Sequence, residues 1–277
     1  MTADPVIRLR FWGTRGSLPV SGEAFRRFGG ATMSIEMRCG PVCLLFDAGS
    51  GVGPAGKALA AEGVTRLHLL FTHCHYDHIL GFPFFAPLYN PAAEIDFWSG
   101  HLFGTTTTRQ MIGDFMGPPF FPVGPDVCPA RLRFHDFEPG AVLEPAPGLR
   151  LLTRRLNHPG GAVGYRVEWG GKVVCIVTDT EHEPGTLDPT VIELIRGADL
   201  FIYDASYLDS EMARYKGFGH STWQQAVRLA EAAGVARAGM IHHAPWRTDA
   251  ELAAIEAEAR AILPGAFVTA DGMTAEA

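Results

Sequence analysis

The chain has 277 residues, 47% of them hydrophobic, with 23 basic and 30 acidic side chains and a formal net charge of −7. This length and apolar content are enough for a globular protein with a substantial core. The negative charge excludes the broad basic face that holds long nucleic acids through their phosphates. We therefore expect a small substrate and no extended nucleic-acid partner.

Membrane insertion, export and disulfide bonding are not signalled either. No run approaches about 18 uninterrupted apolar residues, and residues 1–5 do not begin a basic stretch followed by an apolar one. We expect no membrane span and a cytoplasmic location. The five cysteines are odd in number and form no CxxC pair, which favours reduced thiols over a disulfide framework or a thiolate zinc site.

Short strands dominate the prediction for the first half of the chain, because apolar or alternating runs there are bounded by glycine and proline. The predicted elements are strands at 7–12, 34–38, 43–47 and 67–72, with a short helix at 55–62. Residues 82–129 are rich in aromatic side chains and proline, and they predict loops around a helix at 106–116. These loops either shape a pocket or cover an edge of the core.

Local signals are clearer in the second half. Alternating side chains at 163–169, the pair Gly170-Gly171 and the apolar run 173–177 predict a hairpin whose second strand is buried. Three helices are marked by their end signals. Asp188-Pro189 opens a helix that Gly197 closes, a capping box at 221–224 opens another, and a capping box at 248–251 opens one that stops at Pro264-Gly265.

Strands and helices alternate through both halves, and no repeat or linker divides the chain. This pattern predicts one α/β domain, residues 1–277, with two sheets packed face to face and helices on the outside. The expected architecture is a four-layer αββα sandwich.

Four metal-capable side chains follow the strand predicted at 67–72 within six residues: His73, His75, Asp77 and His78. Residues two apart in an extended segment point the same way, so His73 and His75 can bind one ion while Asp77 and His78 face a second. Imidazole and carboxylate ligands suit zinc, manganese or iron. The intervening Cys74 should point away and pack as a small apolar side chain.

Three further candidates stand at the ends of apolar runs: His158 after 151–156, Asp179 after 173–177 and His242 after 239–241. An aspartate has two oxygens and can join two cations, so Asp179 is the natural bridge. His243 is adjacent to His242, and either of them could be the ligand.

The motifs together resemble the metallo-β-lactamase superfamily over essentially the whole chain. They are HxHxDH at 73–78 followed by Ile-Leu-Gly-Phe at 79–82, then His158, Thr-Asp-Thr at 178–180 and Ile-His-His-Ala-Pro at 241–245. Phe-Trp-Gly-Thr-Arg-Gly-Ser at 11–17 and Phe-Asp-Ala-Gly-Ser at 46–50 resemble the branch that holds cyclic-phosphate and cyclic-nucleotide phosphodiesterases and the tRNA 3′-processing nucleases.

This resemblance implies a ligand set for each of two divalent ions, most simply zinc, with manganese or iron as alternatives. The first ion would take His73, His75 and His158, the second Asp77, His78 and His242, with Asp179 shared. The segments 203–206 and 219–222 resemble later motifs of the nuclease branch, in which an acidic residue and a histidine assist catalysis, here Asp204 and His220. That acidic position is usually glutamate, and no basic insertion resembling a tRNA-gripping arm is present.

The expected chemistry is attack on phosphorus by a hydroxide that bridges the two ions. Asp77 would orient this hydroxide, His220 would protonate the departing alkoxide, and Asp204 would hold the His220 ring. Arg15, flanked by Gly13-Thr14 and Gly16, is expected to contact the substrate phosphate, together with His243. His68, His101, His135 and His182 are expected to be structural or surface residues.

The leading hypothesis is thus a binuclear metal-dependent phosphodiesterase that cleaves a small or cyclic phosphodiester. Hydrolysis of a lactone, thioester or β-lactam at the same site is an alternative, as is a metal-bearing sensor without turnover. A homodimer is compatible with the sequence, which does not define the physiological substrate.

Overall fold

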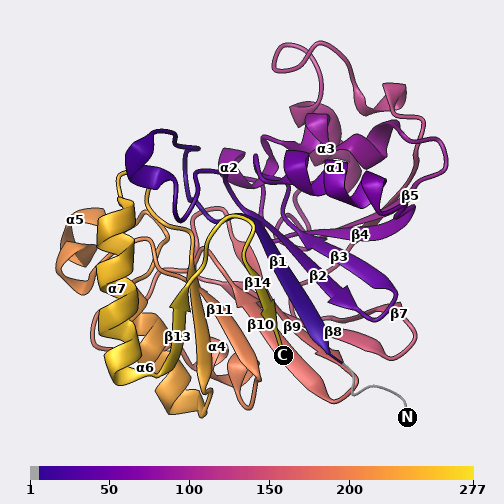
Figure 1. Cartoon of the computed structure of the whole chain (residues 1–277). Coiled ribbons are helices and arrows are strands. Elements are labelled where there is room, and N and C mark those ends of the chain that lie inside the picture. The colour runs from indigo at the N-terminus through magenta and orange to yellow at the C-terminus, as the bar shows by residue number, and fades with distance from the viewer. Residues whose placement is uncertain (1–5) are drawn as a thin grey trace.

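A computed structural model describes residues 6–277. The prediction that no export signal is present concerns residues 1–5, which lie outside the described residues. The described residues form two seven-stranded sheets that face each other, with helices on the outer face of each (Figure 1). The predicted αββα sandwich is confirmed. No helix among residues 6–277 is long and apolar enough to span a membrane.

The first sheet has the strand order β14-β1-β2-β3-β4-β5-β6, and its strands β3 to β6 are parallel. Side chains alternate between its faces: Leu44 and Phe46 enter the core between the sheets, whereas Cys43 and Leu45 pack under the outer helices. Its strands are β1 Ile7–Gly13, β2 Ser34–Cys39, β3 Val42–Phe46, β4 Arg66–Phe71, β5 Glu94–Ser99, β6 Arg131–Asp136 and β14 Thr274–Glu276.

The second sheet has the order β13-β12-β11-β10-β9-β8-β7, parallel from β10 to β13 and antiparallel from β7 to β10. The predicted hairpin is its centre, and the second strand is buried as expected because Val174 and Ile176 face the first sheet while Cys175 and Val177 face the helices. Its strands are β7 Val142–Ala146, β8 Leu149–Leu156, β9 Ala162–Trp169, β10 Lys172–Val177, β11 Leu200–Asp204, β12 Arg237–Ile241 and β13 Gly265–Val268.

The longer helices complete the outer layers. The first sheet is covered by α1 and α3, and the second by α4, α6 and α7. The short helices α2 and α5 lie in the loops that follow β4 and β11 (Figure 1). The bounds are α1 Val52–Ala61, α2 Tyr76–Ile79, α3 Thr108–Phe115, α4 Pro189–Ile195, α5 Met212–Tyr215, α6 Trp223–Ala233 and α7 Asp249–Ile262.

Two of the three predicted helix starts are confirmed, and one is shifted. Asp188 caps α4, and Thr248 forms a capping box with Glu251 at the start of α7. The box predicted at 221–224 is wrong by one residue, because Thr222 is the N-cap of α6 and its side chain accepts from the backbone N–H of Gln225. The Ser221 hydroxyl instead bonds the side chains of His182 and Tyr203.

The prediction of loops around one helix at 82–129 is incomplete. The helix is present as α3, and three 3₁₀ turns cover Phe82–Phe84, Ala86–Tyr89 and Pro125–Val127. The segment also contributes β5, whose side chains alternate between half-buried and buried and which pairs with β4 and β6. The prolines and aromatic residues on either side therefore obscured the sequence signal of this six-residue strand.

The direction of the strands places the candidate residues at one edge of the sandwich. Asp47 follows β3 and His73 follows β4, while His158, Asp179 and His242 follow β8, β10 and β12. The strands within each group run the same way, so their carboxyl ends meet. Polar side chains from both sheets converge at this edge.

Candidate metal centre

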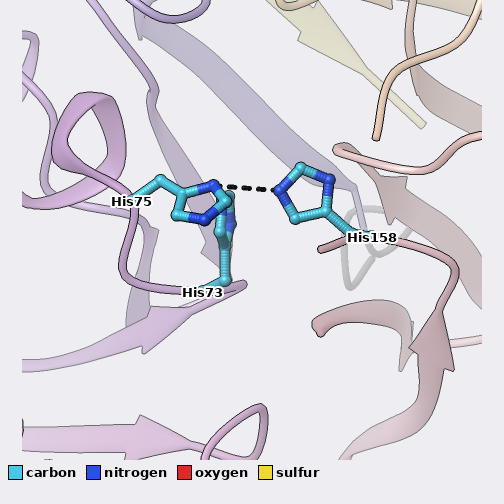
Figure 2. Close-up of side chains that lie close together, drawn as sticks. All are labelled: His73, His75 and His158. Carbon is cyan, nitrogen blue, oxygen red and sulfur yellow. Dashed lines mark hydrogen bonds between the residues drawn. The ribbon is translucent and has the colours of Figure 1, made fainter. Parts of the chain in front are cut away.

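Three imidazoles from two distant parts of the chain converge on one point. His75 Nδ1 lies 2.9 Å from His73 Nε2 and 3.0 Å from His158 Nε2, although His158 is 83 residues further along the chain. Figure 2 shows His75 and His158 facing each other with His73 beside them. Three ring nitrogens this close form a ligand set for one ion.

Asp77, His78 and His242 form a second set. The Asp77 Oδ2 atom lies 3.4 Å from His78 Nε2 and 3.1 Å from His242 Nε2. The two imidazole nitrogens are 3.4 Å apart. Asp77 and His78 lie on α2, whereas His242 comes from the second sheet, so this set is completed only when the two sheets pack.

Asp179 lies between the two sets. Its Oδ1 is 3.3 Å from His78 Nε2, and its Oδ2 is 3.3 Å from His242 Nε2 and 3.7 Å from His73 Nε2. One carboxylate therefore reaches both sets, as a ligand shared by two ions must. The structure brings all seven predicted ligand residues together.

Hydrogen bonds on the far side of four rings orient them. Each Nδ1 atom faces an acceptor, so the Nε2 lone pair points into the cluster, an arrangement that is typical of histidine ligands. The partners are Thr72 Oγ1 for His73 at 3.2 Å, Asp47 Oδ2 for His78 at 2.8 Å, the Gly219 carbonyl for His158 at 2.8 Å and Ser206 Oγ for His242 at 2.9 Å.

Backbone strain is concentrated around the same cluster. In the described residues 6–277, four non-glycine residues have φ in the left-handed region: Ser17, Asp47, Asp179 and His242. Two of them are ligand candidates, and the backbone N–H of Ser17 donates to Asp77 Oδ2 at 2.7 Å. Such conformations cost about 1–3 kcal/mol each and persist where the surroundings fix them, most often at functional sites.

Two glycines make room for the ligand rings. A Cβ atom at Gly16 would lie 2.1 Å from atoms of the His242 ring, and one at Gly219 would lie 2.2 Å from His158 Nδ1. Neither position can hold a larger residue without displacing a ligand candidate.

Electrostatics favour a cation in this cluster. Burial alone would lower the pKa of His242, but Asp179 and Asp77 raise it to about 9. Burial also opposes the charged form of Asp179, yet His242 and His78 hold the pKa of its carboxyl well below the usual range. The buried carboxylates therefore remain ionised because the imidazoles beside them hold protons. A divalent ion can replace those protons, because metal binding releases protons from its ligands, so the donor set fits such ions.

A cavity of about 460 Å³ opens onto the cluster and is lined by residues of both predicted ion sites, with Ser17, Cys74, Tyr76 and His220. His220 Nδ1 donates to Asp204 Oδ2 at 2.9 Å, which leaves Nε2 available to a substrate. Cys74 is only half-buried: it contacts the core under α1 as predicted but also lines this cavity. A larger cavity, about 690 Å³ beside His182, touches none of the seven ligand candidates.

Arg15 does not have the place predicted for it. Its side chain is fully buried, and its guanidinium donates to the carbonyls of Gly29 at 2.8 Å and Arg247 at 2.6 Å and, at 3.4 Å, to that of Ala244. A group enclosed in this way cannot reach a substrate in the cavity. The flanking segment acts instead through its backbone, because Gly16 packs against His242.

His243 is also not positioned to contact a substrate. It is buried, its Nε2 donates to the Thr269 carbonyl at 2.9 Å, and its ring packs edge-on against Phe28. Burial lowers the pKa of His243 to about 3, so the ring is neutral. His242 alone of the pair points into the cluster, since a left-handed backbone at His242 turns the two side chains in different directions.

Sequence reasoning missed the residues that orient the ligands. Asp47 accepts from His78 and also from the backbone and hydroxyl of Thr72, at 2.7 and 2.8 Å. Ser206 joins His242 to Asp204. The segment at 46–50 had been noted as a family motif, but only the structure shows which ring its aspartate holds.

The class of protein follows from this fold and site, and comparison with known families agrees. Residues 43–243 match the model of the beta-lactamase superfamily domain, which is well over half of the chain. The chain therefore belongs to the metallo-β-lactamase superfamily, and it carries a His/Asp metal-site cluster of the kind expected in its hydrolases.

Individual relatives are distant. The chain is 24% identical to ribonuclease Z of Gemmatimonas aurantiaca, in an alignment that covers 97% of this chain and 95% of the relative. Its fold is similar to that of the metallo-β-lactamase-fold protein YhfI of Bacillus subtilis, with a TM-score of 0.73, 17% identity and coverage of 99% and 100%. It is also similar to a diphosphatase of the PhnP family, with a TM-score of 0.69, 18% identity and coverage of 98% and 97%.

Proposed function

We propose that this protein is a two-metal-dependent phosphodiesterase that cleaves a small or cyclic phosphodiester. The observation that carries the proposal is the position of Asp179, which lies within 3.7 Å of imidazoles from both ligand sets. Asp179 also lines the same cavity as His220, whose ring is held by Asp204. Two divalent ions, most simply zinc, supply Lewis acidity when bound and lower the pKa of water from 15.7 to about 7.

The protein's own groups have distinct roles in this proposal. Asp77 is held by the backbone N–H of Ser17, so its carboxylate is fixed at the cavity wall and can orient the attacking water. His220 protonates the departing alkoxide through Nε2, a step that contributes about 10²–10⁴-fold in comparable enzymes. Asp204 fixes the His220 ring and the tautomer that this step needs.

Phosphorus as the reacting centre is supported by the relatives named ribonuclease Z. A small substrate is favoured over an RNA because the net charge of −7 opposes binding of a polyanion. The substrate is therefore expected to enter the cavity whole rather than extend across the surface.

Turnover of bis(p-nitrophenyl) phosphate tests the proposal. Chelation should abolish it, restored metal should recover it, and Asp77→Ala should reduce it at least a hundredfold. Asp114→Ala, an exposed aspartate on α3, is the matched control and should behave as wild type. Activity that survives chelation would contradict the proposal.

Assays on the same purified protein distinguish the two alternatives, an acyl hydrolase and a metal-bearing sensor, from the phosphodiesterase. Rapid turnover of nitrocefin or a lactone without turnover of the phosphodiester would identify the acyl hydrolase. Bound metal without turnover of any of these substrates would favour the sensor.

A further inference from the structure

Beside the metal centre lies a cluster of four aromatic residues, which we call the aromatic rim: Tyr207, Tyr215, Phe218 and Trp246. They come from two segments of the chain: the connection between β11 and α6, which contains α5, and the loop between β12 and α7. Nearly half of Trp246 and most of Phe218 are exposed, at 46% and 62%. The proposed chemistry uses none of these side chains.

Three of the four rings of the rim are arranged in parallel. Tyr207 and Tyr215 have centroids 4.5 Å apart with an interplanar angle of 11°, and Tyr215 and Trp246 are 5.4 Å apart at 25°. Phe218 packs edge-on against Tyr215. Stacked neighbours fix the orientation of Trp246 before any ligand arrives, so binding of a planar group there costs little side-chain ordering.

The rim adjoins the cavity at the metal centre through His220. The Tyr207 ring lies 5.8 Å from that of His220, which lines the cavity, and 6.3 Å from that of Trp246. In the proposed mechanism, a substituent on the oxygen that His220 protonates lies next to Tyr207, the rim residue beside His220. The guanidinium of Arg214 lies 5.3 Å from the Tyr215 ring centroid and adds a positive charge that suits an anionic substrate.

We infer that the aromatic rim binds a planar ring on the leaving alcohol, so that the preferred substrate is a nucleoside-type phosphodiester rather than an aliphatic one. This inference rests on the proposed phosphodiesterase function. Every nucleobase has an aromatic face, and stacking on a protein side chain recognises it without hydrogen bonds to its edges.

The test compares two five-membered cyclic phosphates on the metal-loaded enzyme: 2′,3′-cyclic AMP, which carries a base, and ethylene phosphate, which does not. Trp246→Ala should raise KM for 2′,3′-cyclic AMP about tenfold, equivalent to about 1.4 kcal/mol and within the range for a stacked base. It should leave ethylene phosphate turnover unchanged. Trp246→Phe should recover most of the loss, and Phe120→Ala, an exposed aromatic elsewhere, should have no effect.

An equal loss on both substrates, or no loss on either, would overturn the inference. A second outcome against it is a homodimer, detected by light scattering, that Trp246→Ala dissociates while KM for 2′,3′-cyclic AMP stays the same, because the rim would then be a subunit interface. If the wild type hydrolyses neither compound, that result counts against the proposed function alone.

The rim is then tested by calorimetry. Trp246→Ala should weaken binding of AMP about tenfold and leave binding of ribose 5-phosphate unchanged. Equal weakening of both would refute the inference.

Discussion

Arg15 is a buried cation whose guanidinium donates to backbone carbonyls of three other residues, Gly29, Ala244 and Arg247. These carbonyls belong to the loop after β1 and the loop after β12, so the side chain joins two segments that border the second ligand set. Its role is therefore to hold the backbone that packs Gly16 against His242.

Replacing Arg15 with alanine should lower the free energy of unfolding by about 2 kcal/mol or more, since the carbonyls of Gly29 and Arg247 lose their donor and each such loss costs about 1–3 kcal/mol. The Ala244 carbonyl keeps the backbone N–H of Arg247 at 2.9 Å. Denaturant unfolding measures this change. Arg26→Ala, on a side chain that is 76% exposed, is the control and should change stability by less than about 0.5 kcal/mol. Unchanged stability combined with a raised KM would restore the original prediction that Arg15 binds phosphate.

His101 gives the fold a pH dependence that can be isolated. The ring is buried, its Nδ1 is 3.0 Å from Ser99 Oγ, and burial lowers its pKa to about 3. In the unfolded chain the ordinary pKa near 6.5 applies. Between about pH 6.5 and 3, His101 is therefore protonated in the unfolded state but neutral in the folded state. The stability that His101 contributes above pH 6.5 is consequently lost as the pH falls towards 3.

The difference in unfolding free energy between wild type and His101→Asn, measured with metal chelated, should consequently fall between pH 6.5 and 5 by about 1.4 kcal/mol per pH unit at most. Titrating groups remote from His101 are common to both proteins and cancel in the difference. A difference that is flat across this range would show that His101 is readily protonated in the folded protein.

At the scale of elements, the loop between α5 and α6 is fixed by one carboxylate. Glu181 accepts from the backbone N–H groups of Gly217 and Gly219, the latter at 2.8 Å. The carbonyl of Gly219 in turn orients His158, and the next residue is His220. Glu181 is thus a positioning residue that joins the loop after β10 to both a ligand candidate and the proposed acid.

Glu181→Ala should weaken metal retention about tenfold and lower kcat, as losses of outer hydrogen bonds to ligands do. Glu181→Gln should recover most of both, because an amide oxygen can accept the same two bonds. Glu183→Ala, which removes an exposed partner of Lys216, is the control. Metal titration and steady-state kinetics provide the readouts, and an alanine variant with wild-type metal affinity would refute the role.

Elements with strong local signals could be predicted from the sequence, and weakly marked ones could not. The hairpin of β9 and β10 and the helices α4 and α7 carry alternation, glycine turns and caps, which are local properties. The strand β5 lacks such marks, and its pairing with β4 and β6 is decided by tertiary packing. The shift of the α6 cap has the same origin, because Ser221 is taken by His182 and Tyr203.

For the whole molecule, the ligand candidates could be predicted because their residue types and strand-end positions are visible in the chain. The orienting partners could not, since Asp47 and Ser206 are ordinary polar residues until folding brings them to His78 and His242. Arg15 was misassigned for the converse reason: a Gly-rich flank suits both a phosphate contact and a buried backbone clamp, and burial alone separates the two.

The stoichiometry of bound metal tests the central claim most directly. Elemental analysis of purified protein, reconstituted with zinc and freed of excess, should give two ions per chain. Replacing His73 and His158 with alanine should leave about one, and replacing the peripheral Asp114 should leave two. Protein that binds no transition metal after reconstitution, or that keeps both ions in the double variant, would contradict a centre built from two ligand sets joined by Asp179.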